Sequence, residues 1–425
     1  MNKEENKVKN VFLPIVADDL PFNAYQTRGF EFGVLYTQEK EKILPFLYSF
    51  FINVRMQKVD LGQKFNFVFD KRSWFAGYNV FQYEEFTFPV LPTQDEYIAS
   101  IKEHLGNGFY GSSCFDEYYV PVKSSYQKRR FSHGFLLYGF DDTVESLYST
   151  GYTKSGNFEK FPVKYEDMYR ALWHNNARTI HYRKLNKDFE YKFDTRKCYE
   201  ELHQYLNSIY IGVGHTNSEV YGYKVNDGFR EYVSEVISKY KMIDIRYARF
   251  FFEHKSFMLD RLKYLKNEGY IKDYISQYET VDRIYKTVYM MLLKYNMTGN
   301  ASSADRTNEM LLEANQIELS VLGEVLNDLE KCLAKDALNE YKAVLEADDR
   351  KKLRDKSRIY NVLNALQTYT DASHYLTTNE ILEYLASKNI TADKRALSRD
   401  IKKLIEIGID IKISNDGIAH YNIEK

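Results

Sequence analysis

The fold of the C-terminal region is decided by residues 377–403, whose sequence is TTNEILEYLASKNITADKRALSRDIKK. Thr377 and Glu380 have the spacing of a capping box. In such a box the threonine hydroxyl accepts a hydrogen bond from a helix-start N–H group, and the glutamate bonds back to the cap residue. Apolar residues then recur at the spacing of one helix face. The pattern predicts a helix over 378–388.

A further helix is expected after a short turn. Thr391 is a good N-cap, and Leu397 and Ile401 lie on the apolar face of a helix predicted over 392–407. Gly408 fits the position just past a helix end, where a left-handed backbone is common.

The flanking residues complete a small domain. Residues 358–369 predict a preceding helix. Two alternating apolar runs, 409–413 and 418–423, flank the hairpin signal Asn-Asp-Gly at 415–417. This order of helices followed by a hairpin is typical of a winged helix-turn-helix, which we expect over 357–425.

The polar side of the helix over 392–407 is mainly basic, with five basic residues against three acidic ones. Arginine side chains contact guanine in the major groove, and lysine or serine side chains bind phosphate. The sequence therefore predicts that this side binds double-stranded DNA, through Lys394, Arg395, Ser398, Arg399, Lys402 and Lys403.

Residues 393–404, DKRALSRDIKKL, resemble the third helix in the DNA-binding heads of DeoR-like and WYL-type bacterial transcription regulators. In those families the helix has the form T-x-R-T-[VL]-x-R-D-[IL]-x-x-L. Arg395, Arg399 and Asp400 match this form, whereas Ala396 stands in place of the usual threonine. The resemblance covers about one sixth of the chain and implies transcription regulation. Since no sensor follows the head in this sequence, we expect the N-terminal region to take that role.

The middle of the chain has a helical pattern. Apolar residues recur at helical spacing over 249–266, 281–295 and 309–333, which predicts an antiparallel helical bundle over 194–345. A charged run without an apolar face, 346–356, predicts a linker.

The N-terminal region combines both kinds of element. Short aromatic and β-branched runs indicate strands at 65–69, 85–90 and 134–139, with helical stretches at 93–105 and 164–173. The pattern predicts an α+β domain over 11–193. The fold class expected for the whole chain is therefore α+β, with a helical bundle and a C-terminal winged helix-turn-helix.

A candidate thiol site lies in the α+β domain. His133 begins an apolar run, so we expect a histidine at the start of a buried strand. A histidine backed by a carboxylate can act as the general base for a thiol nucleophile. Cys114 and Asp116 share one face of a predicted strand, which suggests that Cys114 approaches His133 from the neighbouring strand. The candidate catalytic residues are thus Cys114, Asp116 and His133.

The same region resembles the papain-like domain of the butirosin-biosynthesis acyltransferase type, the BtrH N-terminal family. The matching positions are Gly108, Asp116, Tyr118, Pro121, His133, Gly139, Phe140 and Asp141. The resemblance extends over residues 11–335. It implies a papain-like fold, and it implies that the gene occurs together with peptide natural-product genes. It also implies a cysteine near the domain start, a histidine, and a carboxylate on the next strand.

The sequence departs from that family at two places. It has no cysteine between Met1 and Ser113, and residues 149–151, Ser-Thr-Gly, replace the aspartate expected after Tyr148. We therefore expect an inactive, repurposed site. The alternative is a thiol acyltransferase or thioesterase of peptide-antibiotic biosynthesis, rebuilt on Cys114 and His133. A third alternative is a protein that only mediates interactions.

The composition limits the other possibilities. The 425 residues carry a net charge of −1, so any nucleic-acid binding must be local. The three cysteines show neither metal-ligand nor disulfide spacing, and we expect no metal and no cofactor. No apolar run is long enough for a membrane span, and the first residues lack a signal sequence. These features favour a cytoplasmic protein and are compatible with an oligomer.

The function expected from the sequence is that of a DNA-binding regulatory protein. The winged helix would bind DNA, and the acyltransferase-like domain would sense a small-molecule ligand or an acyl or peptidyl carrier protein. This expectation depends on the basic helix and on the missing nucleophile.

Overall fold

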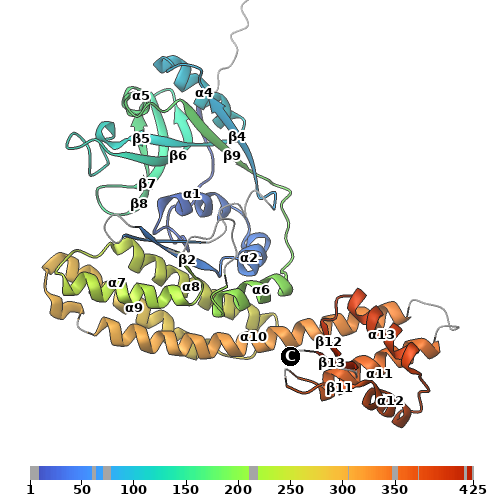
Figure 1. Ribbon diagram of the computed structural model, residues 1–425. Coiled ribbons are helices and arrows are strands. Elements are labelled where there is room, and N and C mark those ends of the chain that lie inside the picture. Colours follow the sequence, from blue (N-terminus) through green and yellow to red (C-terminus); the bar gives the residue numbers. More distant parts are fainter. Residues whose placement is uncertain are drawn as a thin grey trace, which may run out of the picture. The chain divides into compact units, whose positions relative to one another are not determined.

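The computed structural model describes residues 9–59, 64–69, 78–209, 219–304, 306–346, 353–371, 373–415 and 419–423. The chain forms two compact units, Met1–Leu326 and Asn327–Lys425, here called the N-terminal and C-terminal units. Helices and strands are both abundant (Figure 1), which confirms the prediction of a mixed α and β fold.

The N-terminal unit contains a large antiparallel sheet with the strand order β4-β9-β5-β6-β7-β8. These strands are β4 (Phe81–Thr87), β5 (Tyr110–Asp116), β6 (Ser132–Asp141), β7 (Ser146–Tyr152), β8 (Phe158–Lys164) and β9 (Thr179–Leu185). The first half of β6 pairs with β5, and its second half pairs with β1 (Asn10–Phe12). Since β7 pairs with the opposite edge of β6, β1 and β5 lie end to end along the same edge of β6.

Helices cover both faces of this sheet. On one face, α4 (Gln94–Gly106) and α5 (Tyr165–His174) bury their apolar sides against alternate strand residues, such as Phe115 and Phe135. The helix α4 begins at a capping box formed by Thr93 and Glu96. On the other face, α1 (Gln26–Leu35) lies against β6 and β7 (Figure 1).

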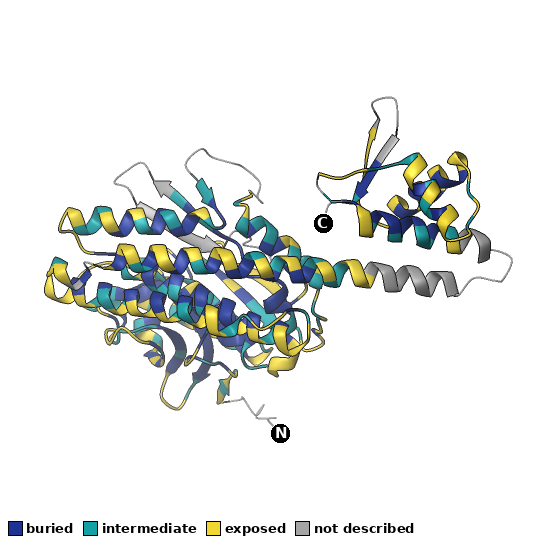
Figure 2. Ribbon diagram, turned by 90° about the horizontal axis from the view of Figure 1, so that it is seen from below, coloured by how far each residue is buried: buried dark blue, intermediate teal, exposed yellow. Residues whose placement is uncertain are grey.

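The N-terminal unit has six further described α-helices; three of them, at 245–267, 275–298 and 307–346, overlap the predicted stretches 249–266, 281–295 and 309–333, and the other three were not predicted individually. The six are α2 (Lys40–Ser49), α6 (Thr195–Leu206), α7 (Lys224–Ser238), α8 (Ile245–Asn267), α9 (Ile275–Thr298) and α10 (Thr307–Glu346). A small sheet joins them, with the order β10-β2-β3, formed by β2 (Val54–Val59), β3 (Lys64–Phe69) and β10 (Glu219–Tyr221). Figure 2 shows buried residues on the inner sides of these helices, and Val54 and Met56 of β2 and Tyr221 of β10 are also buried.

The helix α8 ties the helical region to the beginning of the chain. The carboxylate of Glu253 accepts hydrogen bonds from the backbone N–H groups of Asn23 and Ala24, at 3.1 and 3.0 Å. The guanidinium of Arg261 donates to the carbonyl oxygens of Tyr48 and Phe50, at 3.0 and 2.5 Å. These bonds place residues before and after position 193 in one compact unit.

The division between the units therefore differs from the predicted boundaries at 193/194 and 345/346. It falls between Leu326 and Asn327, inside α10. The first half of that helix belongs to the N-terminal unit, and the second half, up to Glu346, belongs to the C-terminal unit. The predicted linker 346–356 is helical at Glu346 and again from Leu353, while its residues 347–352 lie outside the described residues.

The C-terminal unit contains the three helices and the two hairpin strands predicted for it, together with a short strand at 376–377 that was not predicted. They are α11 (Leu353–Tyr369), β11 (Leu376–Thr377), α12 (Thr378–Ser387), α13 (Lys394–Glu406), β12 (Ile411–Asn415) and β13 (Ala419–Ile423). The strands form a sheet with the order β11-β13-β12. Of the predicted hairpin turn at 415–417, Asn415 ends β12, and Asp416 and Gly417 lie outside the described residues. Residues of all three helices, with Ile411 and Tyr421, form the core.

The sequence predicted the N-cap residues of two helices in this unit, and the structure confirms one of the two predictions. The capping box of Thr377 and Glu380 is confirmed, since the threonine hydroxyl accepts from the Glu380 N–H at 3.2 Å and the carboxylate accepts from the Thr377 N–H at 2.6 Å. The predicted N-cap Thr391 is wrong. The N-cap of α13 is Asp393, whose carboxylate accepts from the Ala396 N–H at 2.7 Å.

Candidate functional site

The basic side of α13 is exposed as predicted. At 3.6 residues per turn, the polar positions occupy about half of the helix circumference. The other half is buried and carries Leu397, Ile401 and Leu404, which lie in the core of the unit. All six residues predicted to contact DNA are exposed: Lys394, Arg395, Ser398, Arg399, Lys402 and Lys403.

A buried ion pair fixes α13 on its inner side and removes one acidic residue from the surface. Asp400 is 1 % exposed, and its carboxylate accepts two hydrogen bonds from the Arg358 guanidinium of α11, at 2.5 and 3.1 Å. Bidentate pairs of this kind fix orientation as well as charge. Asp400 is therefore a structural residue, and the exposed charge of α13 is more positive than its sequence indicates.

The position at which α13 departs from the regulator pattern is also buried. Ala396 is 7 % exposed and belongs to the first turn, next to the cap Asp393. Its side chain therefore lies away from the exposed basic side, so the departure leaves that surface unchanged.

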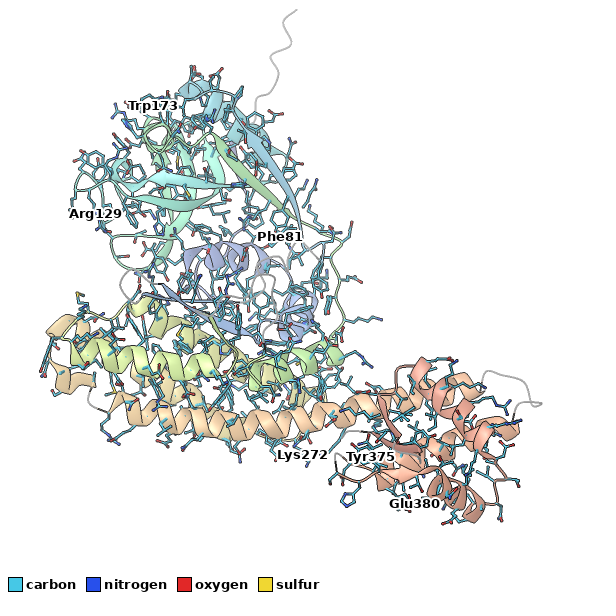
Figure 3. All side chains as sticks on the ribbon, viewed as in Figure 1. Phe81, Arg129, Trp173, Lys272, Tyr375 and Glu380 are labelled. Atoms are coloured by element: carbon cyan, nitrogen blue, oxygen red, sulfur yellow. The ribbon has the colours of Figure 1, made fainter. Side chains whose placement is uncertain are left out.

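The first turn of α12 carries an acidic residue and no basic one. Glu380, labelled in Figure 3, lies in the first turn of that helix and is bonded to Thr377. The strand β12 presents Lys412 and Ser414, which are both exposed. The concentration of exposed cations on α13 makes this helix the candidate nucleic-acid interface.

The structure does not bring the three predicted thiol-site residues together. In the register of β5 and β6, Cys114 is opposite Gly134 and Phe115 is opposite His133. Paired residues of an antiparallel ladder project to the same face, and successive residues to opposite faces. Cys114 and His133 therefore lie on opposite faces of the sheet. The expectation that Cys114 approaches His133 is wrong, because it left out the register of the two strands.

Asp116 has a structural role in the loop between β5 and β6. Its carboxylate accepts hydrogen bonds from the backbone N–H groups of Tyr118 and Phe131, at 3.0 and 3.2 Å, and pairs with Arg130. Burial raises the pKa of Asp116, but these donors outweigh it and hold the pKa below its ordinary value. Arg129, labelled in Figure 3, lies on the outside of the unit.

His133 pairs with a different carboxylate, which the sequence did not single out. Its Nδ1 lies 2.9 Å from Glu117 Oε1, and the same oxygen is 3.7 Å from Lys123 Nζ. Lys123 is 2 % exposed and donates a hydrogen bond to the carbonyl oxygen of Tyr152. Burial lowers the pKa of Lys123 to about 8, against the opposing effect of Glu117. No spacing signal pointed to this trio, because its members come from three separate segments.

The first turn of α1 contacts the sheet through Gln26, which the sequence analysis also missed. The Gln26 amide donates to the carbonyl oxygen of Gly134 at 2.7 Å, and its oxygen is 3.5 Å from the Tyr152 nitrogen. On β7, the hydroxyls of Ser149 and Thr150 donate to strand carbonyl oxygens. The polar groups near this helix start therefore belong to the hydrogen bonding of the fold.

Cys114 instead lines a cleft on the α1 side of the sheet. The cleft has a volume of about 540 Å³ and lies between α1, the strands β5 and β9, and the loop after α5. Its polar groups include Glu31 of α1, Ser112 and Cys114 of β5, and His181 and Arg183 of β9. Cys114 is exposed there, whereas Cys198 is completely buried.

The described residues contain no group of three His, Cys, Asp or Glu side chains arranged to hold a metal ion. Within the same part of the chain, no helix has the length and hydrophobicity needed to span a bilayer. No model of a known protein family matches the chain, and no curated protein is significantly similar to it. The resemblances to DNA-binding regulators and to the acyltransferase family therefore stay predictions.

Proposed function

We propose that this chain is a DNA-binding regulatory protein of the bacterial cytoplasm. Its C-terminal unit binds double-stranded DNA as a winged helix-turn-helix, with α13 in the major groove. Its N-terminal unit, a papain-like domain without a complete catalytic site, binds a ligand or a carrier protein linked to peptide natural-product biosynthesis.

The observation that carries this proposal is the two-sided character of α13. One side is buried in the core, and the other exposes five cations and a serine. Asp400, which would oppose phosphate binding from the surface, is buried against Arg358. A helix of this kind beside an antiparallel hairpin has the geometry and charge that major-groove binding requires.

The enzyme alternative has less support. It requires Cys114 to be activated by His133, and these side chains lie on opposite faces of the sheet. His133 is instead bonded to Glu117. A regulatory role does not require Cys114 and His133 to be in contact, so we favour it over acyl transfer.

The test is selection of DNA by the full-length protein from a pool of randomised duplexes at low salt, followed by gel-shift titration of the enriched sequence. Replacing Arg395 or Arg399 by alanine is expected to weaken binding of that sequence by about 5- to 150-fold, because each lost base contact costs about 1–3 kcal/mol. Lys402→Ala is expected to lower the slope of log K against log salt by about 0.9, the contribution of one phosphate contact.

The matched control is Lys187→Ala, which removes an exposed cation from the N-terminal unit and should leave the affinity unchanged. The proposal fails if no sequence is enriched and no binding is detected at low salt. It also fails if Lys187→Ala weakens binding as much as Arg395→Ala does.

A further inference from the structure

The cleft between α1 and the strands β5 and β9 has the size and charge of a small-molecule site. Its volume of about 540 Å³ is in the range of ligand pockets. We propose that this cleft binds a monocarboxylic acid with an apolar body. This inference names the ligand of the N-terminal unit, and its regulatory meaning rests on the proposed function.

Arg183 is the cationic group of the cleft that lacks a close anionic partner in the described part of the chain. Its side chain is 15 % exposed, yet its contacts are long: Nη2 is 3.4 Å from Ser112 Oγ and Nη1 is 3.9 Å from Glu31 Oε1. Its buried Nε has no hydrogen-bond partner among the described residues. A guanidinium has five N–H donors, and poorly satisfied buried donors are costly. A carboxylate beside Nη1 and Nη2 would give Arg183 the close anionic partner that it lacks.

The neighbouring carboxylate does not fill this role. Glu31 is bonded to Arg28 at 2.6 Å through its other oxygen, so its charge is shared between two arginines. At the rim, Arg178 donates to the carbonyl oxygen of Pro89, and Glu85 is paired with His181. Of the charged residues that line the cleft, Arg178 and Arg183 face the carboxylate of Glu31, and the excess of one positive charge suits a ligand with a single negative charge.

Part of the cleft lining is apolar, formed by Phe30, Gly134 and Ala177. Gly134 has no side chain, and a Cβ atom at this position would lie 3.8 Å from the ring of Phe30, 3.8 Å from the Ser113 carbonyl oxygen and 3.9 Å from the Gln26 amide nitrogen. An apolar chain placed over Gly134 would contact these groups and leave its carboxylate near Ser112 and Arg183.

Cys114 provides a reporter inside the cleft. Its thiol is exposed and lines the same space, so a bound ligand should shield it from alkylation. Cys332 belongs to α10 and is partly exposed outside the cleft, so it serves as an internal control. Both rates can be followed by mass spectrometry of the full-length protein treated with iodoacetamide.

The experiment measures these rates with hexanoate and with hexanamide, its neutral analogue. For a Kd of about 1 mM, about 10 mM hexanoate should slow alkylation of Cys114 about tenfold. Hexanamide should have little effect, and Cys332 should react at an unchanged rate. Arg183→Gln should abolish the protection, and Arg183→Lys should restore part of it. Arg170→Gln, which removes an exposed arginine from α5, should leave the protection intact.

The inference is overturned if hexanoate does not slow the reaction of Cys114, or if it slows Cys332 equally. Equal protection by hexanamide would also overturn it. These comparisons use the wild-type protein, so they decide the matter even if Arg183→Gln fails to fold. The alkylation assay is run without DNA and the gel-shift assay without hexanoate, so each assay tests one proposal independently of the other. Loss of Cys114 protection with DNA binding intact would reject only the ligand, and the reverse result would reject only the regulatory function.

Discussion

Lys123 and Arg358 are both largely buried cations, and they differ in how closely a carboxylate pairs with them. Arg358 has a bidentate partner, Asp400, at 2.5 and 3.1 Å, so its charge is compensated inside the C-terminal unit. Lys123 lies over the rings of Phe135 and Phe161, and the nearest carboxylate oxygen, from Glu117, is 3.7 Å away. Burial without a close counter-charge favours the neutral amine.

This difference predicts a pH dependence for the N-terminal unit. The pKa of Lys123 is lowered from 10.5 to about 8 by burial, so between these values the unfolded chain binds more protons than the folded one. Stability contributed at this site should therefore rise with pH across that window. Relative to Lys123→Met, the wild type should gain about 2 kcal/mol in free energy of unfolding between about pH 7 and 9.5.

Urea unfolding followed by tryptophan fluorescence measures this gain, because both tryptophans, Trp74 and Trp173, lie in the N-terminal unit. Lys154→Met, at an exposed lysine, serves as the control and should show no such change. Parallel pH profiles of the wild type and Lys123→Met would contradict the prediction.

At the scale of the element, α13 shows that the apolar spacing of the sequence predicts the buried side of a helix, whereas the choice of its N-cap residue is ambiguous. Thr391 and Asp393 both precede the helix, and both are residue types that cap helices well. The structure uses Asp393, whose carboxylate reaches the Ala396 N–H at 2.7 Å. The apolar spacing predicted the buried side correctly, because burial every three to four residues depends only on the helical period.

The cap assignment predicts different costs for two similar substitutions. Asp393→Ala should destabilise the C-terminal unit by about 1 kcal/mol, because the Ala396 N–H loses its acceptor. Thr391→Ala should cost less than about 0.3 kcal/mol, since an exposed residue outside the helix is removed. Amide hydrogen exchange over 394–406 measures both values, and an equal effect of the two variants would restore Thr391 as the cap.

For the whole molecule, buried polar side chains on α8 decide which segments belong together. Glu253 and Arg261 bind backbone groups of the first fifty or so residues, and Lys255 pairs with Glu318 of α10 at 2.8 Å. Lys255 and Glu318 are both completely buried. These long-range bonds make one unit of a region in which the sequence indicated two domains.

Removing Lys255 should therefore destabilise the N-terminal unit. Lys255→Met leaves the buried Glu318 without its cation, which should cost about 3 kcal/mol or more, and adding Glu318→Gln should recover part of the loss. Tryptophan fluorescence during urea unfolding measures the change. Hydrogen exchange over 353–423 should stay as in the wild type, because the network lies within the N-terminal unit. Equal loss of protection in both units would contradict this.

The sequence by itself determined the helices of the C-terminal unit, α8 to α10 in outline, the α13 cations and the mixed α and β class, because caps and apolar periods act between residues a few positions apart. It could not determine which of its conspicuous polar residues meet. Strand register, a tertiary property, placed Cys114 and His133 on opposite faces of the sheet. Partners distant in the sequence decided the rest. Gln26 meets Gly134, Arg358 meets Asp400 and Lys255 meets Glu318, because a buried polar group needs whichever partner the packed fold brings within reach.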